Sequence, residues 1–547
     1  MTELVEKKYD LMHYWDIIMP GKPPRQSQIE TFKWIESLSS DIKYILLEMP
    51  VGGGKSPVGL TISAWLNQGY GSSFILTPQK VLQKQYEDSF DDKVLFSMYG
   101  KSNYHCKGKD TSCELGDTIK PRCKECPQRT AFQRALISNN LVLNYSLAML
   151  YFLYVDKIEP RNLMIMDECH NLETQLVNFT TLDVSEFMCE RMKKIKYKEP
   201  ANITEAREWI KEEYLPCVDE YIMELQEEVR RIEHFTEHNP NMKLTKADES
   251  VLKNNTMFKR HRDKIIDVIQ HDVDELIKSY VLIPSKGKFS LKELYGRNAF
   301  NNIMKPMAEK FLFMSSTILN KDGFCADLGI NPEETAFLSL ESEFAAENRP
   351  VIYSAKAKMN YGWDTAKRKG DRDRMIEGIR SALDSHSEVS GIIHTGSFKM
   401  SNWIIDELYD NKSHYIIHHN PYDGMRGNRD DAIDDYMRSA AAQPTLLISP
   451  SITEGLDLKD DIGRFAIFAK VPYPSLGDNW IKRRMEISSD WYQRQTLKEI
   501  IQGSGRICRT PDDWGVTYIL DASFTYLYNS TKKHTIPQWW KDSFHIV

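Results

Sequence analysis

The chain has 547 residues, enough for two to four domains, and its 27% charged residues are ordinary for a globular protein. A net charge of −7 excludes a surface that attracts nucleic acid as a whole, so such contacts would need local basic patches. Because no apolar run approaches the ~18 residues of a membrane span, we expect a cytoplasmic or nucleoid-associated protein without a membrane partner.

An amphipathic helix is predicted from Ile29 to Leu38, after an irregular, aromatic-rich stretch over residues 1–24. Arg25 and Gln28 stand at its start, one helix before a phosphate-binding motif. In that position the Gln28 amide can pair with the edge of an adenine, and an ordinary surface glutamine fits the sequence equally well.

A glycine-rich turn follows a buried strand at 44–47 and precedes a helical pattern at 57–66. In this context backbone N–H groups and the helix N-terminus bind phosphate oxygens. We expect Lys55 to reach the β and γ phosphates of ATP and Ser56 to hold Mg²⁺. Met49 stands where the usual motif has its first glycine. The other loop residues expected at the nucleotide are Pro50, Gly52, Gly53 and Gly54.

A second buried strand at 74–78 is followed, between residues 103 and 130, by a segment with little apolar periodicity. Four of the nine cysteines lie there: Cys106, Cys113, Cys123 and Cys126. In a chain without a signal region, clustered cysteines indicate a metal site rather than disulfides. Four thiolates suit an iron–sulfur cluster or tetrahedral zinc, although zinc ribbons normally have two Cys-x2-Cys pairs and this chain has one.

Asp167 and Glu168 follow directly after an apolar strand at 163–166. Ligands bind at this end of the strands in open parallel sheets. We expect Asp167 to bind the Mg²⁺ that Ser56 also holds, and Glu168 to orient and deprotonate the attacking water. An Asp-Glu pair can also simply cap a loop, but the upstream phosphate motif favours catalysis.

The second half of the chain predicts another α/β domain. Residues 174–292 are charged and helical, and a strand returns at 311–317. Helices then alternate with strands, which predicts a mainly parallel sheet. These strands are expected at 392–394, 415–418, 445–449, 465–469 and 516–520.

Arg506 and Arg509 share a face of a predicted helix near the end of the chain. Two guanidinium groups there could clamp a γ-phosphate held by the first domain. By themselves they are better explained as a surface pair that binds a carboxylate.

The order of these segments resembles superfamily 2 helicases, and in detail the XPD/DinG family of iron–sulfur DNA helicases. The resemblance covers the chain from Arg25 to about Ser523. Small departures, such as Cys169 in place of alanine in the Asp-Glu-x-His box, leave it intact. The motifs that carry it are Arg25-x-x-Gln28, Glu48-Met49-Pro50, Thr77-Pro78, Asp167-Glu168-x-His170-Asn171, Ser315-Ser316-Thr317, the segment 391–398, Glu454-Gly455-Leu456-Asp457 and Gln502-x-x-Gly505-Arg506-x-x-Arg509.

The resemblance implies two RecA-like parallel-sheet motor domains with ATP between them. It further implies a [4Fe–4S] cluster on the four clustered cysteines and an α-helical Arch-like insertion. Gln502, Arg506 and Arg509 would act on ATP from the second domain, where Glu454 and Asp457 also contact it. Single-stranded DNA would be contacted near Thr77, Asn144, Thr395 and Ser397.

The expected domain limits follow from these assignments. The first motor domain would comprise 1–100, 136–180 and 296–340, and the second 341–547. The iron–sulfur module would occupy 101–135 and the Arch-like insertion 181–295.

The function implied is that of a monomeric, ATP-dependent DNA helicase moving 5′-to-3′ on single-stranded or forked DNA in repair, replication or recombination. An RNA–DNA hybrid is a further substrate that the sequence leaves open. The first alternative is a translocase that strips proteins or removes R-loops without processive unwinding. Two others are a zinc-binding scaffold with a vestigial ATPase and a metabolic ATPase or kinase, against which the complete set of motifs argues.

Overall fold

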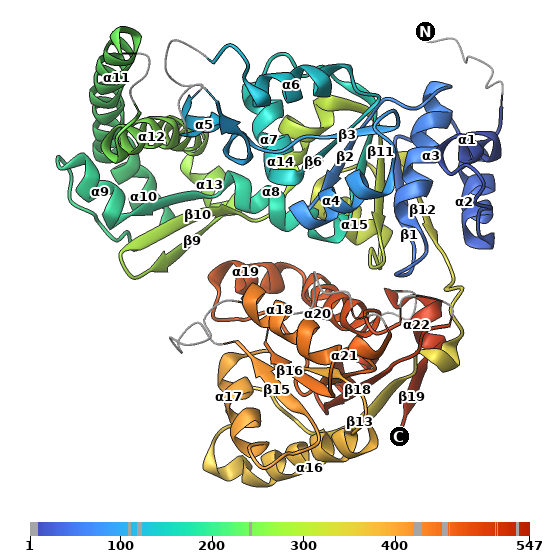
Figure 1. The fold of residues 1–547 in the computed structure, drawn as a ribbon. Coiled ribbons are helices and arrows are strands. Elements are labelled where there is room, and N and C mark those ends of the chain that lie inside the picture. Colours follow the sequence, from blue (N-terminus) through green and yellow to red (C-terminus); the bar gives the residue numbers. More distant parts are fainter. Residues whose placement is uncertain are drawn as a thin grey trace.

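The computed structural model describes residues 9–107, 111–116, 123–239, 243–419, 429–450, 458, 460–508, 510, 512–531 and 535–547. Two α/β domains lie one above the other, and a mostly helical insertion extends from the upper one (Figure 1). Within these residues, none of the helices combines the length and apolar character needed to cross a bilayer. The predicted fold class, two parallel-sheet domains, is confirmed.

The first domain is built on a seven-stranded sheet in the order β12-β1-β11-β7-β2-β6-β3, with every neighbouring pair parallel. The central strands are apolar and buried on both faces, as expected where helices cover both sides of a parallel sheet. The strands are β1 (Tyr44–Glu48), β2 (Ser73–Thr77), β3 (Leu95–Ser97), β6 (Asn140–Asn144), β7 (Arg161–Asp167), β11 (Ala308–Ser315) and β12 (Thr335–Ser339).

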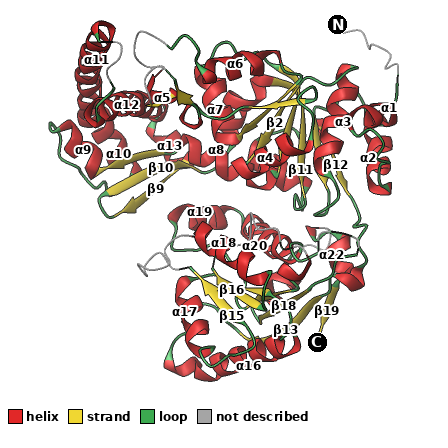
Figure 2. Ribbon diagram, viewed as in Figure 1, coloured by secondary structure: helices red, strands yellow, loops and turns green. Residues whose placement is uncertain are grey.

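Helices cover both faces of this sheet (Figure 2). One of them, α1 (Leu11–Ile18), lies in a stretch that the sequence analysis treated as irregular. It buries Leu11, Trp15 and Ile18 and packs against α3, so its helical spacing was present but short. The others are α2 (Gln26–Glu36), α3 (Lys55–Asn67), α4 (Lys80–Ser89), α6 (Pro127–Ile137), α7 (Tyr145–Tyr154), α8 (Leu172–Thr180) and α15 (Lys321–Leu328).

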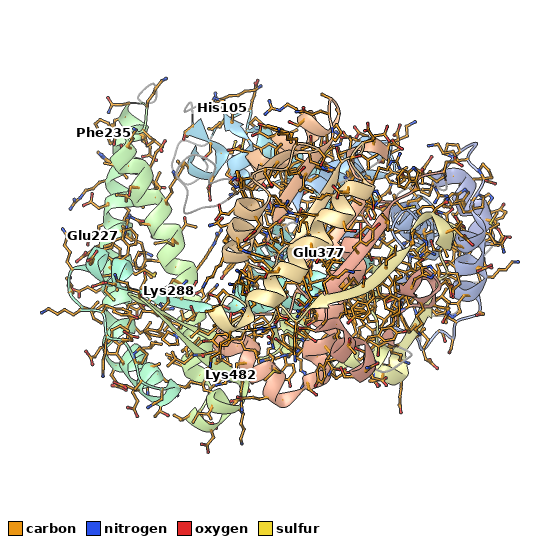
Figure 3. All side chains as sticks on the ribbon, turned by 90° about the horizontal axis from the view of Figure 1, so that it is seen from below. His105, Glu227, Phe235, Lys288, Glu377 and Lys482 are labelled. Carbon is orange, nitrogen blue, oxygen red and sulfur yellow. The ribbon has the colours of Figure 1, made fainter. Side chains whose placement is uncertain are left out.

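The insertion after α8 is mostly helical, but it also contains a three-stranded antiparallel sheet in the order β8-β10-β9, which the sequence analysis did not predict. Its long helices form an antiparallel pair at one side of the molecule, where Phe235 and Glu227 mark the first of them (Figure 3). The strands are β8 (Leu182–Ser185), β9 (Tyr280–Ser285) and β10 (Lys288–Glu293), and the helices are α9 (Glu186–Met192), α10 (Ile203–Trp209), α11 (Leu215–His238), α12 (Lys246–Gln270) and α13 (Val273–Ser279).

The four-cysteine segment has little regular structure. It contains the short pair β4 (His105–Cys106) and β5 (Thr111–Ser112), followed by the one-turn helix α5 (Cys113–Gly116). Its own buried cluster consists of Cys106, Cys113 and Cys126, with Tyr104 and Cys123 packed against them. So small a cluster buries little apolar surface, in agreement with the weak periodicity of this segment.

The second domain has its own seven-stranded parallel sheet in the order β15-β16-β14-β17-β18-β13-β19. The proposed boundary at residue 340 falls between the last strand of the first sheet and β13. The strands are β13 (Val351–Ala357), β14 (Gly391–His394), β15 (Tyr415–His418), β16 (Thr445–Ser449), β17 (Phe465–Phe468), β18 (Val516–Asp521) and β19 (Phe544–Ile546); the helices are α16 (Lys369–Ser385), α17 (Phe398–Glu407), α18 (Arg429–Ala440), α19 (Asn479–Ile487), α20 (Ser489–Ser504), α21 (Phe524–Ser530) and α22 (Gln538–Asp542).

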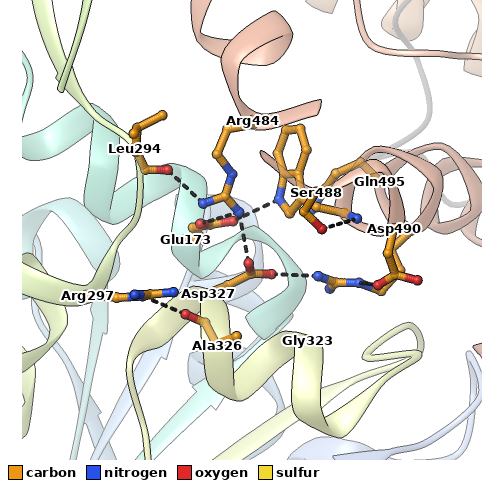
Figure 4. A network of polar contacts seen from close by, with 12 residues as sticks. Glu173, Leu294, Arg297, Gly323, Ala326, Asp327, Arg484, Ser488, Asp490 and Gln495 are labelled. Carbon is orange, nitrogen blue, oxygen red and sulfur yellow. Dashed lines mark hydrogen bonds and ion pairs between the residues drawn. The ribbon is translucent and has the colours of Figure 1, made fainter. Parts of the chain in front are cut away.

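A buried network of charges joins the two domains (Figure 4). Arg484 of α19 binds Glu173 of α8 at 3.0 Å and Asp327 of α15 at 2.8 Å. Arg494 of α20 binds the other oxygen of Asp327 at 3.1 Å and also pairs with Asp490. The Arg484 side chain is only 1% exposed, so its charge depends on these partners.

We expect Arg484→Met to loosen the docking of the two domains. Methionine keeps most of the apolar volume but leaves the Glu173 carboxylate without its cation, and breaking a buried pair costs about 3–5 kcal/mol. Thermal unfolding should begin about 5 °C lower or more. Arg483→Met is the matched control, because Arg483 lies exposed and, among the described residues, forms its ion pair with Glu486. Equal melting curves for the two variants would contradict the structural role of the network.

Candidate nucleotide site between the two domains

The glycine-rich loop connects β1 to α3 and has the backbone of a phosphate cradle. Gly52 and Gly54 adopt φ values of 80° and 77°, which side chains larger than hydrogen rarely accept. A Cβ on Gly54 would lie 2.4 Å from Nε2 of Gln28, so this position also lacks room. Lys55 begins α3, and the unpaired N–H groups of this helix end face the loop.

Arg25 and Gln28 both hold the loop from outside. Nη1 of Arg25 donates to the carbonyl of Gly52 at 2.5 Å, and Nε2 of Gln28 donates to the carbonyl of Gly53 at 3.2 Å. Oε1 of Gln28 accepts from the backbone N–H of Arg25 at 2.9 Å. Both ends of the amide are therefore engaged within the protein, and the contact of Gln28 with adenine stays a prediction.

The strand order brings the loop and the Asp-Glu pair together. β1 and β7 flank β11, and the residues that follow all three strands meet at the same edge of the sheet. Nζ of Lys55 lies 3.2 Å from Oε1 of Glu168. Glu168 has a left-handed backbone with φ 49°, which turns its side chain back toward the loop.

The two carboxylates differ in their electrostatic surroundings. Burial and the neighbouring Glu168 charge raise the pKa of Asp167 to about 6. Burial alone would also raise the pKa of Glu168, but the Lys55 ammonium and His170 together bring that pKa well below its ordinary value. Glu168 is therefore held as a carboxylate in this arrangement.

Asp167 is fixed by a set of donors. Its Oδ2 accepts from the hydroxyl of Tyr86 at 3.0 Å, and its Oδ1 accepts from the N–H of Glu168 at 3.0 Å. The hydroxyl of Tyr145 donates to its main-chain carbonyl at 2.8 Å. The Ser56 side chain also lies beside the hydroxyl of Tyr86. The Ser56 and Asp167 oxygens thus converge, and oxygen donors of this kind suit Mg²⁺.

A chain of contacts leads from Glu168 into the second domain. Nδ1 of His170 lies 3.2 Å from Oε2 of Glu168 and 2.8 Å from Oγ of Ser315. Oγ of Ser315 accepts from the N–H of Thr317, whose hydroxyl accepts from Nε2 of Gln502 at 2.8 Å. Gln502 belongs to the last turn of α20. These contacts therefore connect the second domain, through three intermediate residues, to Glu168, the carboxylate that pairs with Lys55.

The end of α20 also touches the phosphate loop itself. A Cβ on Gly505 would lie 3.3 Å from Cγ2 of Val51, which places the backbone next to Arg506 against the loop. Nζ of Lys498 donates to the carbonyl of His170 at 3.2 Å. Three residues expected at the nucleotide, Arg509, Glu454 and Asp457, lie outside the described residues.

The residues expected at DNA lie at strand ends, but their side chains serve local structure. Thr77 and Asn144 are paired on β2 and β6, where Asn144 caps α7 and the hydroxyl of the buried Thr77 donates to the carbonyl of Gln79. Thr395 follows β14 and is bonded to Ser401, and Ser397 caps α17. Contact between these four residues and nucleic acid stays a prediction.

The thiols of the four-cysteine segment come close to one another. The Sγ atoms of Cys113 and Cys126 are 3.9 Å apart, and a Cβ on Gly116 would lie only 2.5 Å from Sγ of Cys106. Burial, together with the nearby Cys126 and Cys106, raises the pKa of Cys113 to about 11. Among the described residues, no group of three or more His, Cys, Asp or Glu side chains is arranged as a finished metal site.

A cavity of about 1000 Å³ lies where the four-cysteine segment, α7, α8 and the insertion meet. The guanidinium of Arg260 lies 6.0 Å from the ring centre of Tyr154, and Nζ of Lys264 lies 5.8 Å from that of Phe179. The lining is acidic as a whole, because three basic side chains are set against the six carboxylates of Glu114, Asp183, Asp263, Asp267, Glu275 and Glu293. The sequence analysis did not identify this cavity, because its lining comes from separate elements that share no motif.

Other missed residues are Tyr86 and the charged network at the interface. Tyr86 occupies an inward position of an amphipathic helix, which in sequence resembles a core residue. Asp327 and Arg484 are separated by 157 residues, and no local pattern signals such a pair. For this network the sequence offered one indication, the charge of Glu173 in the helix that follows the Asp-Glu motif.

Two family descriptions match the chain. The family described as "Type III restriction enzyme, res subunit" matches residues 21–204, which include the phosphate loop and the Asp-Glu pair. The family described as "Helicase C-terminal domain" matches residues 383–543, which include α20. The two matches therefore fall on the two domains that meet at the candidate site.

Curated relatives match over short segments. "Regulator of telomere elongation helicase 1 homolog" of Caenorhabditis elegans is 27% identical over 108 residues, which are 17% of this chain and 10% of that protein. "ATP-dependent DNA helicase CHL1" of Vanderwaltozyma polyspora is 26% identical over 166 residues, 26% of this chain and 19% of that protein. The matched segments thus span a fifth or less of the length of these relatives.

Solved structures match over nearly the whole fold. The structure titled "XPD_Helicase" has a TM-score of 0.58 at 16% identity, over 96% of this chain and 99% of that one. "Structure of S. tokodaii Xpd4" has a TM-score of 0.56 at 12% identity, over 96% and 100%. At such identities the likeness concerns the fold.

We expect Gly54→Ala to weaken nucleotide binding at least tenfold. A left-handed backbone costs a Cβ-bearing residue roughly 1–2 kcal/mol, and the new methyl group would collide with Gln28. Titration with a fluorescent ATP analogue would measure the change. Gly69→Ala is the matched control, because Gly69 lies beyond the other end of α3 with open space around it. Unchanged affinity in Gly54→Ala would mean that the loop does not hold the nucleotide.

Proposed function

We propose that this chain, which belongs to the XPD/DinG-like family of superfamily 2 helicases, hydrolyses ATP to move along single-stranded DNA and part duplexes. The observation that carries the proposal is the chain of contacts from Gln502 through Thr317, Ser315 and His170 to Glu168. It joins a phosphate loop in one domain to a second α/β domain, as an ATP-driven motor requires. An isolated kinase or metabolic ATPase would not need the second domain at this position.

In the proposed mechanism, Lys55 exchanges partners when ATP binds. Its ammonium now pairs with Glu168, and the β and γ phosphates offer a stronger anionic partner within reach of the same loop. Glu168 is then free to accept a hydrogen bond from the attacking water and, in the transition state, its proton. His170 stays bonded to Ser315 and keeps the Glu168 carboxylate aimed at the cleft.

Ser56 and Asp167 would hold Mg²⁺, which neutralises charge on the phosphates during transfer. Arg506 would meet the γ-phosphate when the two domains close, because the adjacent Gly505 already touches the phosphate loop. We propose the same role for Arg509, which follows three residues later in the sequence. Because the phosphate leaves after each turnover, closure and opening of the cleft would alternate and advance the strand.

Single-stranded DNA is the proposed substrate, and the support for it is the likeness to the family. The cavity beside the four-cysteine segment is not assigned to its path, because acidic side chains outnumber basic ones in the lining. We propose 5′-to-3′ movement and a monomeric, cytoplasmic protein on the same ground. The likeness to the family leaves an RNA–DNA hybrid within the proposal.

We further propose that Cys106, Cys113, Cys123 and Cys126 hold a [4Fe–4S] cluster. The support is the convergence of the thiols and the small apolar core of the described residues in this segment, where Leu115 packs on the insertion beside the cysteine cluster. The 3.9 Å between two Sγ atoms is also close to the edge of a zinc–thiolate tetrahedron, about 3.8 Å for bonds of 2.3 Å. Metal analysis therefore decides between the two occupants.

The central test is the rate of ATP hydrolysis with and without single-stranded DNA, in the wild type and in Glu168→Gln. We expect strong stimulation by DNA in the wild type. The glutamine keeps the shape of Glu168 but cannot accept a proton, so the variant should bind ATP and turn it over roughly 10²-fold or more slowly. Absence of stimulation would refute the motor function, and normal turnover in Glu168→Gln would refute the assignment of the base.

We expect protein purified without oxygen to contain about four iron and four sulfide per chain. Replacing Cys106, Cys113, Cys123 or Cys126 by serine should remove the metal and the brown colour, and strand separation should fail while some ATPase activity survives. Cys217→Ser is the matched control, because Cys217 lies in the insertion, away from the cluster of thiols. A colourless wild type with one zinc, or a metal-free cysteine variant that still unwinds DNA, would contradict the cluster.

A further inference from the structure

The hydroxyl of Tyr86 lies between the two side chains proposed to bind Mg²⁺. Tyr86 is on α4, 3% exposed, and packs with the apolar residues of the first domain. Its hydroxyl donates to Oδ2 of Asp167 at 3.0 Å, and the Ser56 side chain lies beside it. A purely apolar role would not need this group, since phenylalanine would fill the same space.

The proton arrangement leaves both ligands able to bind a cation. A tyrosine hydroxyl donates one hydrogen bond and can accept another. With Tyr86 donating to Asp167, Ser56 can donate to the Tyr86 oxygen and keep its own lone pairs toward the cleft. Oδ1 of Asp167 is bonded to the N–H of Glu168, so the carboxylate is held at both oxygens in one orientation.

We propose that Tyr86 is a positioning residue that aligns Ser56 and Asp167 for Mg²⁺ bound with the nucleotide. The inference rests on the proposed function and concerns the residues around the metal ligands. Groups that orient metal ligands typically change metal affinity by 10–100-fold when removed. The expected consequence is a specific loss of the Mg²⁺-dependent part of nucleotide binding.

Tyr145 provides an internal comparison. It is equally buried and its hydroxyl donates to the same residue, but to the main-chain carbonyl of Asp167. Removing that hydroxyl loosens the end of β7 without releasing the carboxylate. Tyr99 offers a remote comparison, because its hydroxyl donates at 2.9 Å to Glu87, a carboxylate outside the nucleotide site.

The experiment measures the affinity for fluorescent ADP in EDTA and in Mg²⁺ for the wild type, Tyr86→Phe, Tyr145→Phe and Tyr99→Phe. In Tyr86→Phe the enhancement of affinity by Mg²⁺ should fall about tenfold, while the affinity in EDTA stays unchanged. The Mg²⁺ concentration for half-maximal ATPase should rise by a similar factor, with the rate at saturating Mg²⁺ within about threefold of wild type. The other two variants should keep the wild-type enhancement.

Two results would overturn the inference. The first is an equal loss of ADP affinity in EDTA and in Mg²⁺ for Tyr86→Phe, which would indicate a structural hydroxyl. The second is the same loss of Mg²⁺ enhancement in Tyr145→Phe. A melting curve of each variant shows whether the fold is retained. A wild-type protein whose nucleotide affinity does not respond to Mg²⁺ would refute the proposed site itself. An enhancement that survives Tyr86→Phe refutes only the role of Tyr86.

Discussion

The docking of α19 and α20 on the first domain is the constraint on which the candidate site depends. Arg484 and Arg494 share the Asp327 carboxylate in a buried environment, where an unpaired charge is costly. This anchor fixes the first half of α20, and the last turn then carries Gln502 to Thr317. Together with the apolar packing of Trp480 and Trp491 on Val177 and Leu294, this anchor sets the register of the second domain against the first.

Anchor and site lie at opposite ends of one helix. Arg494 lies in the second turn of α20, whereas Gln502 and Gly505 lie at its end, beside Thr317 and Val51. A movement of the phosphate loop would therefore act on the C-terminal end of α20, while ion pairs hold the N-terminal half of the same helix. The apolar residues of this helix pack with β17 and β18 in a common core, so the helix is in contact with both the phosphate loop and the sheet of the second domain.

Local motifs could be predicted from sequence, and contacts between distant segments could not. Phosphate and metal chemistry dictate the spacing of two local motifs, Lys55-Ser56 and Asp167-Glu168. The structure brings these two motifs together. The β9–β10 hairpin was hidden among charged helices, although Lys286-Gly287 marks its turn. Tyr86 shows the opposite difficulty: it is buried on α4, but its place in a helix says nothing about what its hydroxyl meets.

The departure of the phosphate loop from the usual motif has a structural explanation. Met49 is fully buried, and its N–H donates to the carbonyl of Ser315 at 2.9 Å, so this position continues the sheet instead of turning. The turn is made later, by Gly52 and Gly54 with their positive φ values. Met49 also fills the space beneath Gly53, where its Cε lies 3.5 Å from the place a Cβ would take. Glycine at position 49 would remove this packing without being needed for the turn, so the substitution is compatible with a working phosphate loop.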